Sequence, residues 1–164
     1  MNRYRLPFIA IAAAGLVVGL AIALSDHSSA RAGSKRTVNS TSSSFGRILI
    51  DRRGRTLYLF EKDKGARSAC SGVCATFWPP LLAPQATTLG SGLERSLLGT
   101  VKRPGGSRQV TYGGHPLYRF SGDKAPGQAT GQDMQAFGGG WYVVSPAGKK
   151  IEAEADEGSG GGYR

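Results

Sequence analysis

Between residues 47 and 151 the apolar residues fall in short runs, and polar stretches rich in glycine and proline separate these runs. This pattern is typical of β-strands joined by tight turns. It predicts strands at residues 47–51, 55–60, 97–103, 108–112, 115–120, 141–144 and 149–151, and a long loop at residues 122–140. One short helical segment is expected at residues 68–78, where Pro79 would end it.

The predicted strand at residues 55–60 is apolar on both faces. Successive side chains of a strand point to opposite sides, so Tyr58 and Phe60 share one face while Leu57 and Leu59 share the other. The strand should therefore be covered on both sides. Phe77 and Trp78 are expected to pack beneath the hairpin that this strand closes.

The same strand recurs later in the chain. Residues 57–64 return as residues 117–124, with identical residues at five of the eight positions. An aromatic pair follows each copy, at residues 77–78 and 141–142. Arg119 stands where the first copy has Leu59, so that face of the second strand is expected to be wet.

This duplication predicts the fold class. We expect an all-β domain with one short helical turn, in which two tandem units of antiparallel hairpins form one pseudo-symmetric domain, either a sandwich or a small barrel. Repeat one would cover about residues 47–83 and repeat two about residues 97–148. Much of the core should come from six aromatic residues: Tyr58, Phe60, Trp78, Tyr118, Phe120 and Trp141.

The regions outside the repeats have a different composition. Basic residues precede an uncharged apolar run at residues 6–24, which predicts that residues 1–32 are a signal peptide or a signal anchor. Residues 33–45 are polar and predict a flexible linker, residues 46–152 the duplicated domain, and residues 153–164 a disordered tail. The protein is thus expected to be exported, extracellular or on the outer face of the cytoplasmic membrane.

Charge indicates the kind of partner. The 164 residues carry a formal net charge of +10. Such a surface attracts anionic wall polymers or lipid headgroups. The basic residues do not alternate with aromatics as they do in nucleic-acid grooves, so no nucleic-acid partner is expected. The densest basic cluster gives the candidate anion-binding residues, Arg47, Arg52, Arg53 and Arg55.

Two cysteines, Cys70 and Cys74, lie one helical turn apart, and an even count in an exported chain predicts a disulfide. Asp63 and Asp123 end the two repeated strands and are expected to accept backbone N–H bonds within their loops. His115 lacks any flanking catalytic motif. No catalytic residue, metal site or cofactor is predicted.

Tyr58-x-Phe60-x-x-Asp63 and Tyr118-x-Phe120-x-x-Asp123 resemble the Yx(F/W/Y)xxD signature of a bacterial family of predicted lipoproteins and secreted proteins, built from tandem secreted repeats of unknown function. Three further runs resemble that family, at residues 70–81, 109–118 and 139–146. The resemblance implies export but supplies no activity. The chain departs from a lipoprotein in having no cysteine directly after its apolar run.

Together these features predict an exported cell-envelope protein of unknown function, a non-enzymatic binding or structural module. Its partner would be an anionic wall polymer, lipid headgroups or another envelope protein, with membrane attachment through the N-terminal segment if that segment is not cleaved. The sequence leaves open an alternative, an extracellular redox or electron-transfer accessory that uses Cys70 and Cys74 or a bound metal.

Overall fold

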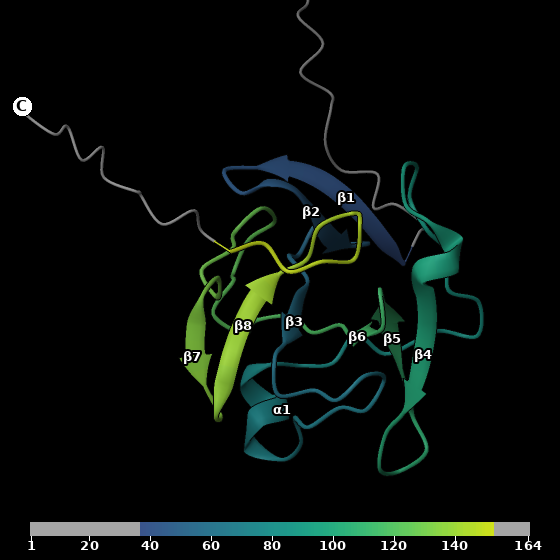
Figure 1. The fold of residues 1–164 in the computed structure, drawn as a ribbon, viewed down its shortest axis with the longest axis vertical. Coiled ribbons are helices and arrows are strands. Elements are labelled where there is room, and N and C mark those ends of the chain that lie inside the picture. The colour runs from purple at the N-terminus through teal and green to yellow at the C-terminus, as the bar shows by residue number, and fades with distance from the viewer. Residues whose placement is uncertain (1–36, 153–164) are drawn as a thin grey trace, which may run out of the picture. The chain divides into compact units, whose positions relative to one another are not determined.

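The computed structural model describes residues 37–152, which form a β-rich domain (Figure 1). Its strands pair antiparallel in three small sheets, β1-β2, β3-β8-β7 and β4-β5-β6, and a short helix follows β3. The predicted fold class, antiparallel β with one helical turn, is confirmed. The elements are β1 (Val38–Ser43), β2 (Gly46–Asp51), β3 (Tyr58–Phe60), α1 (Val73–Phe77), a 3-10 turn (Arg95–Leu97), β4 (Leu98–Lys102), β5 (Arg108–Tyr112), β6 (His115–Pro116), β7 (Met134–Ala136) and β8 (Gly139–Val143).

The folded domain begins earlier than the sequence predicts. Strand β1 lies within the predicted linker at residues 33–45 and pairs with β2 along its whole length. Its residues are polar except for Val38, which is fully buried and bridges to Leu89. The linker prediction failed because an edge strand needs little apolar surface when one buried side chain and its backbone bonds hold it. The predicted signal segment and C-terminal tail lie outside the described residues.

A second strand also escaped the sequence analysis. Strand β7 lies in the predicted loop at residues 122–140 and forms a hairpin with β8. It is only three residues long and is bounded by turns, so its sequence carries no clear alternation. Residues 137 and 138 form the connecting turn, and both have positive φ.

Strand β3 is covered on both faces, as its sequence predicts. Leu57 and Leu59 join an aliphatic cluster with Leu49, Leu81 and Val110, among others. On the opposite face, Tyr58 and Phe60 belong to a second cluster, which contains Trp78, Tyr118 and Trp141. The predicted core aromatics are all buried except Phe120, which is partly buried.

The two repeats are interleaved. Strand β3 of repeat one pairs with β8 of repeat two. Conversely, residues 117–121 of repeat two bond to residues 77–81 of repeat one, through the backbone pairs Leu81 N–Leu117 O (2.8 Å), Arg119 N–Pro79 O (2.9 Å) and Ser121 N–Phe77 O (2.8 Å). Each repeat therefore supplies backbone hydrogen-bond partners to the other.

Interleaving makes a clear prediction for a chain cut between Gln85 and Ala86. Neither piece, 1–85 or 86–164, should fold alone, because each central strand would lose its partner. Mixing the two pieces should restore the near-UV circular dichroism of the intact chain. A native-like spectrum from either isolated piece would contradict the interleaved arrangement.

Candidate functional site

The repeated tyrosines meet at the centre of the domain. Tyr58 and Tyr118 form a reciprocal backbone pair, in which each N–H donates to the carbonyl of the other at 2.9 Å. The side chain of each tyrosine extends into the other repeat. The Tyr58 hydroxyl donates to Asp123 Oδ2 at 2.7 Å, and the Tyr118 hydroxyl donates to Asp63 Oδ2 at 2.9 Å. The tyrosine of each motif thus binds the aspartate of the other motif.

The second carboxylate oxygen of each aspartate holds its own loop. Asp63 Oδ1 accepts the backbone N–H of Ala69 at 2.7 Å. Asp123 Oδ1 accepts both the backbone N–H (2.9 Å) and the hydroxyl (2.7 Å) of Thr130. These bonds have the geometry expected from the sequence. The tyrosine partners were missed, because no sequence pattern shows that the repeats are interleaved.

Burial further favours the protonated form of both tyrosine hydroxyls. Burial, and after it the hydrogen bond to Asp123, raises the pKa of Tyr58 well above its ordinary value. Burial likewise raises the pKa of Tyr118, and the Asp63 carboxylate adds to the rise. Burial also raises the pKa of Asp63, while the bonds from Ala69 and Tyr118 lower it. The tyrosines therefore act as hydrogen-bond donors to the buried Asp123 carboxylate and the partly buried Asp63 carboxylate.

The aromatic residues of the two repeats form one stack. The rings of Trp78 and Trp141 lie 3.9 Å apart and nearly parallel. Phe60 stacks on Trp141 at 4.1 Å, and Phe120 stacks on Trp78 at 4.4 Å. Each tryptophan also receives the edge of a tyrosine, Tyr58 on Trp78 and Tyr118 on Trp141. The duplicated aromatics therefore form the core.

The cysteines are bonded to each other, with a Cα separation of 5.3 Å. Cys70 is 1% exposed and Cys74 is 7% exposed. Burial of both sulfur-bearing residues leaves little surface for an exchange partner, which must reach a disulfide sulfur directly. The bridge fixes the segment that leads into α1.

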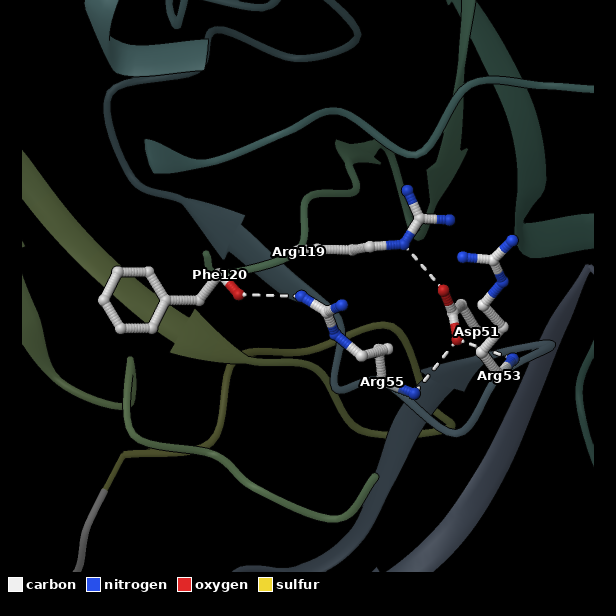
Figure 2. Close-up of polar contacts among 5 residues, drawn as sticks. All are labelled: Asp51, Arg53, Arg55, Arg119 and Phe120. Carbon is white, nitrogen blue, oxygen red and sulfur yellow. Dashed lines mark hydrogen bonds and ion pairs between the residues drawn. The ribbon is translucent and has the colours of Figure 1, made fainter. Parts of the chain in front are cut away.

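Asp51 organises the arginines beside the β2 turn (Figure 2). Its Oδ2 lies 2.6 Å from Arg119 Nε, and its Oδ1 accepts the backbone N–H groups of Arg53 (2.8 Å) and Arg55 (3.0 Å). The Arg55 side chain turns inward and donates to Phe120 O at 3.2 Å. Arg119 was expected to lie on a wet face. It is partly exposed and is held in place by the buried Asp51.

The predicted basic cluster is split. Arg47 lies opposite Ser42 at the far end of the β1–β2 hairpin, and its guanidinium contacts Ser40. Arg52 and Arg53 are exposed in the turn that follows β2. Of the four candidates, Arg52 lines a pocket.

Two adjoining pockets gather arginines from distant parts of the sequence. The first, about 400 Å³, is lined by Arg52 and Arg119, and the second, about 560 Å³, by Arg95 and Arg108. Ala83 and Pro84 line both, so the pockets flank one loop. We call them the arginine pockets. The sequence analysis missed Arg95, Arg108 and Arg119 because these residues come together only in the folded chain.

The charged side chains that line the arginine pockets are all basic. Neither pocket is lined by a carboxylate, a cysteine or a histidine. Within residues 37–152, no group of three or more histidine, cysteine, aspartate or glutamate side chains could hold a metal ion. His115 lies outside both pockets, and burial lowers its pKa, with a smaller contribution from Lys149.

A family model described as a secreted repeat of unknown function matches the chain twice, at residues 40–82 and 99–145. These two matches cover both Tyr-x-Phe-x-x-Asp motifs and both buried tryptophans. The chain belongs to this family of secreted repeats, and it is an exported protein with two tandem copies. No curated protein and no solved structure matches it significantly. Over the described residues, no helix is both long and apolar enough to cross a membrane.

Removal of either motif hydroxyl should destabilise the fold. Tyr58→Phe and Tyr118→Phe each remove the hydroxyl that donates to one carboxylate oxygen, Asp123 Oδ2 or Asp63 Oδ2, at a cost of about 1–3 kcal/mol in the free energy of unfolding. Tyr58→Phe should cost more, because Asp123 is 1% exposed whereas water reaches the partly exposed Asp63. Urea unfolding of the two variants measures both losses. Losses of less than about 0.5 kcal/mol in both would contradict the assigned role.

The Tyr118→Phe variant should also show a specific pH dependence. The hydroxyl lowers the Asp63 pKa, so its removal should raise further a pKa that burial already holds above 3.8. A raised folded-state pKa favours the protonated form, so the cost of the substitution should grow as pH rises through the window above 3.8 and shrink below it. An NMR titration of the Asp63 carboxyl, with urea unfolding at low and neutral pH, tests this. A pH-independent cost would contradict it.

Replacing Cys70 and Cys74 by alanine should lower the free energy of unfolding by about 2 kcal/mol, the entropy associated with so small a ring. The stacked aromatic core should persist, so the near-UV circular dichroism should remain native-like. Chemical unfolding of the reduced wild-type protein provides the matched control. Complete loss of folded structure in the double variant would show that the bridge does more than hold one loop.

Proposed function

We propose that this exported protein is a non-enzymatic binding module of the cell envelope, which holds an anionic wall polymer in the arginine pockets. The observation that carries the proposal is the pair of adjoining pockets, each lined by two arginines and by no acidic side chain. The protein would act in the extracellular space or on the outer face of the cytoplasmic membrane.

The shape and charge of the pockets suit a repeating anion. Arginine presents a planar fork of donors that matches phosphate and carboxylate groups. Each pocket has the volume of a small-ligand site, and both are open to solvent on a surface loop. Two such sites on either side of one loop could receive successive charged groups of one chain.

Arg119 supports the first pocket in a specific way. The buried Asp51 carboxylate fixes its Nε, so the guanidinium is oriented before a ligand arrives. Preorganisation of this kind lowers the entropy lost on binding. The described domain as a whole, residues 37–152, carries 15 basic and 7 acidic side chains, a net charge of +8. This charge would increase the rate of encounter with polyanions.

The pocket arginines can be tested with synthetic poly(glycerol phosphate) as the probe. We expect the triple variant Arg52→Ala, Arg95→Ala and Arg108→Ala to bind the polymer at least tenfold more weakly than wild type at low salt, and with a weaker dependence on salt, because fewer counterions are released. Arg119 is left unchanged, because its removal would leave the buried Asp51 carboxylate without its ion-pair partner and would destabilise the fold. Titration calorimetry over a salt series measures both quantities.

Arg47, Arg53 and Lys102 offer a control of matched charge, because replacing them also removes three positive charges. All three are exposed and line neither pocket. The Arg47→Ala, Arg53→Ala, Lys102→Ala variant should bind nearly as tightly as wild type. An equal loss in both variants would mean that overall charge, and not the arginine pockets, attracts the polymer. No binding by wild type at low salt would refute the proposal and favour a protein partner.

A further inference from the structure

An apolar tip, made of Val73, Phe77 and Phe137, lies outside the arginine pockets. The three side chains are 68%, 50% and 40% exposed, whereas most large apolar residues of the domain are buried. The rings of Phe77 and Phe137 lie 6.1 Å apart although 60 positions separate them in sequence. Helix α1 and the β7–β8 turn lie together at the lower edge of Figure 1. Phe77, expected beneath the hairpin with Trp78, therefore faces solvent.

Phe137 occupies a backbone position that disfavours it. With Gly138 it forms the two-residue turn of the β7–β8 hairpin, and their φ angles are 56° and 84°. A turn with two positive φ angles prefers asparagine, aspartate or glycine at its first position, and a bulky residue there is strained. The side chain remains 40% exposed, so burial offsets this strain only in part. Strained backbone positions of this kind occur most often at functional sites.

The other half of the tip is held rigidly. Val73 and Phe77 lie four residues apart, on one face of α1. The intervening Cys74 points inward and is bonded to Cys70, and the next residue, Trp78, is in the aromatic stack. The helix therefore cannot easily turn its apolar face away from water, so the exposure of this face is built into the fold.

The charges beside the tip are positive. Lys62 donates from Nζ to the carbonyl of Phe137 at 3.2 Å, and Lys64 and Arg67 are exposed in the loop that leads to Cys70. The two acidic residues of this loop are already engaged. Glu61 pairs with Lys150, and Asp63 accepts Ala69 and Tyr118. The free charge of this loop is therefore basic, and Lys62 brings it to the apolar tip.

We propose that the apolar tip inserts into the headgroup region of a bilayer that contains anionic lipids. Burial of aromatic and aliphatic side chains in that region is favourable, and basic neighbours attract the anionic headgroups. A second copy of the chain is a poorer occupant, because two domains of net +8 repel. A sugar surface would stack on the phenylalanine rings but would gain little from the strongly exposed Val73.

The first test asks whether the fold needs Phe137. In Phe137→Asn, asparagine followed by Gly138 is a preferred pair for this turn, so the melting temperature should equal or exceed that of wild type. A melting temperature clearly below that of wild type would mean that Phe137 serves the fold, and would overturn the proposal.

The second test places a reporter at the tip of the full chain reconstituted in vesicles. Phe137→Trp keeps an aromatic ring there, and its added fluorescence should be quenched by brominated lipids in vesicles of phosphatidylglycerol and phosphatidylcholine. Ser44→Trp, in the exposed β1–β2 turn near the opposite edge of Figure 1, is the matched control. Both variants carry the same N-terminal segment, so any attachment through that segment is equal.

Quenching at residue 137 that exceeds quenching at residue 44, and that weakens in phosphatidylcholine alone or at high salt, is the expected result. Equal quenching at both positions would show that the domain has no preferred orientation, and would overturn the proposal. No quenching at residue 137 would do the same and would leave a protein as the partner of the tip. Neither outcome affects the arginine pockets, which the polymer titration tests separately.

Discussion

A carboxylate that folding removes from water, wholly or in part, needs hydrogen-bond donors, and in this domain each of the two repeated aspartates receives a tyrosine hydroxyl from the other repeat. Tyr58 reaches Asp123, and Tyr118 reaches Asp63, around a reciprocal backbone pair between the tyrosines themselves. Because each aspartate also holds its own loop, one pair of bonds connects strand, loop and repeat interface. The rest of the fold depends on this exchange: the aromatic stack on one side and the aliphatic cluster on the other assemble only when both repeats are in place.

Much of this could be read from the chain, because strand periodicity and duplication are local signals. The two-faced burial of residues 57–60 and the short helix before Pro79 follow from side-chain alternation and from the geometry of proline. Strands β1 and β7 could not be found in this way, since pairing with a neighbour, and not apolar content, holds them. The arginine pockets could not be predicted from the sequence either. Arg95, Arg108 and Arg119 are far apart in sequence. The arginines at residues 47–55 are close together in sequence, but in the folded domain their side chains point in different directions.

The two proposed surfaces use the same rigid scaffold differently. The arginine pockets flank the loop after the first repeat, whereas the apolar tip combines the disulfide-bonded helix of repeat one with a hairpin turn of repeat two. The structurally equivalent parts of the repeats, the motif residues and the tryptophans, are used in the core. The parts that differ between repeats supply the surfaces. A duplicated core of this kind leaves its connecting segments free to change, which is where binding residues most often lie.

The ion pair between Asp51 and Arg119 breaks the symmetry of the duplication. In the other half of the domain Tyr112 takes the place of Asp51, because Leu117 N bonds to Val110 O as Leu57 N bonds to Leu49 O. Leu59 takes the place of Arg119 in the repeated motif, and both Tyr112 and Leu59 belong to the aliphatic cluster. Two copies of repeat one would therefore set Asp51 against Leu59, and two copies of repeat two would set Arg119 against Tyr112. The first arrangement would bury an unpaired carboxylate, at a cost of about 3–5 kcal/mol, and the second would leave the partly exposed Arg119 without its partner. Two unlike repeats therefore complement each other better than two like repeats would, which favours closure of the tandem chain on itself.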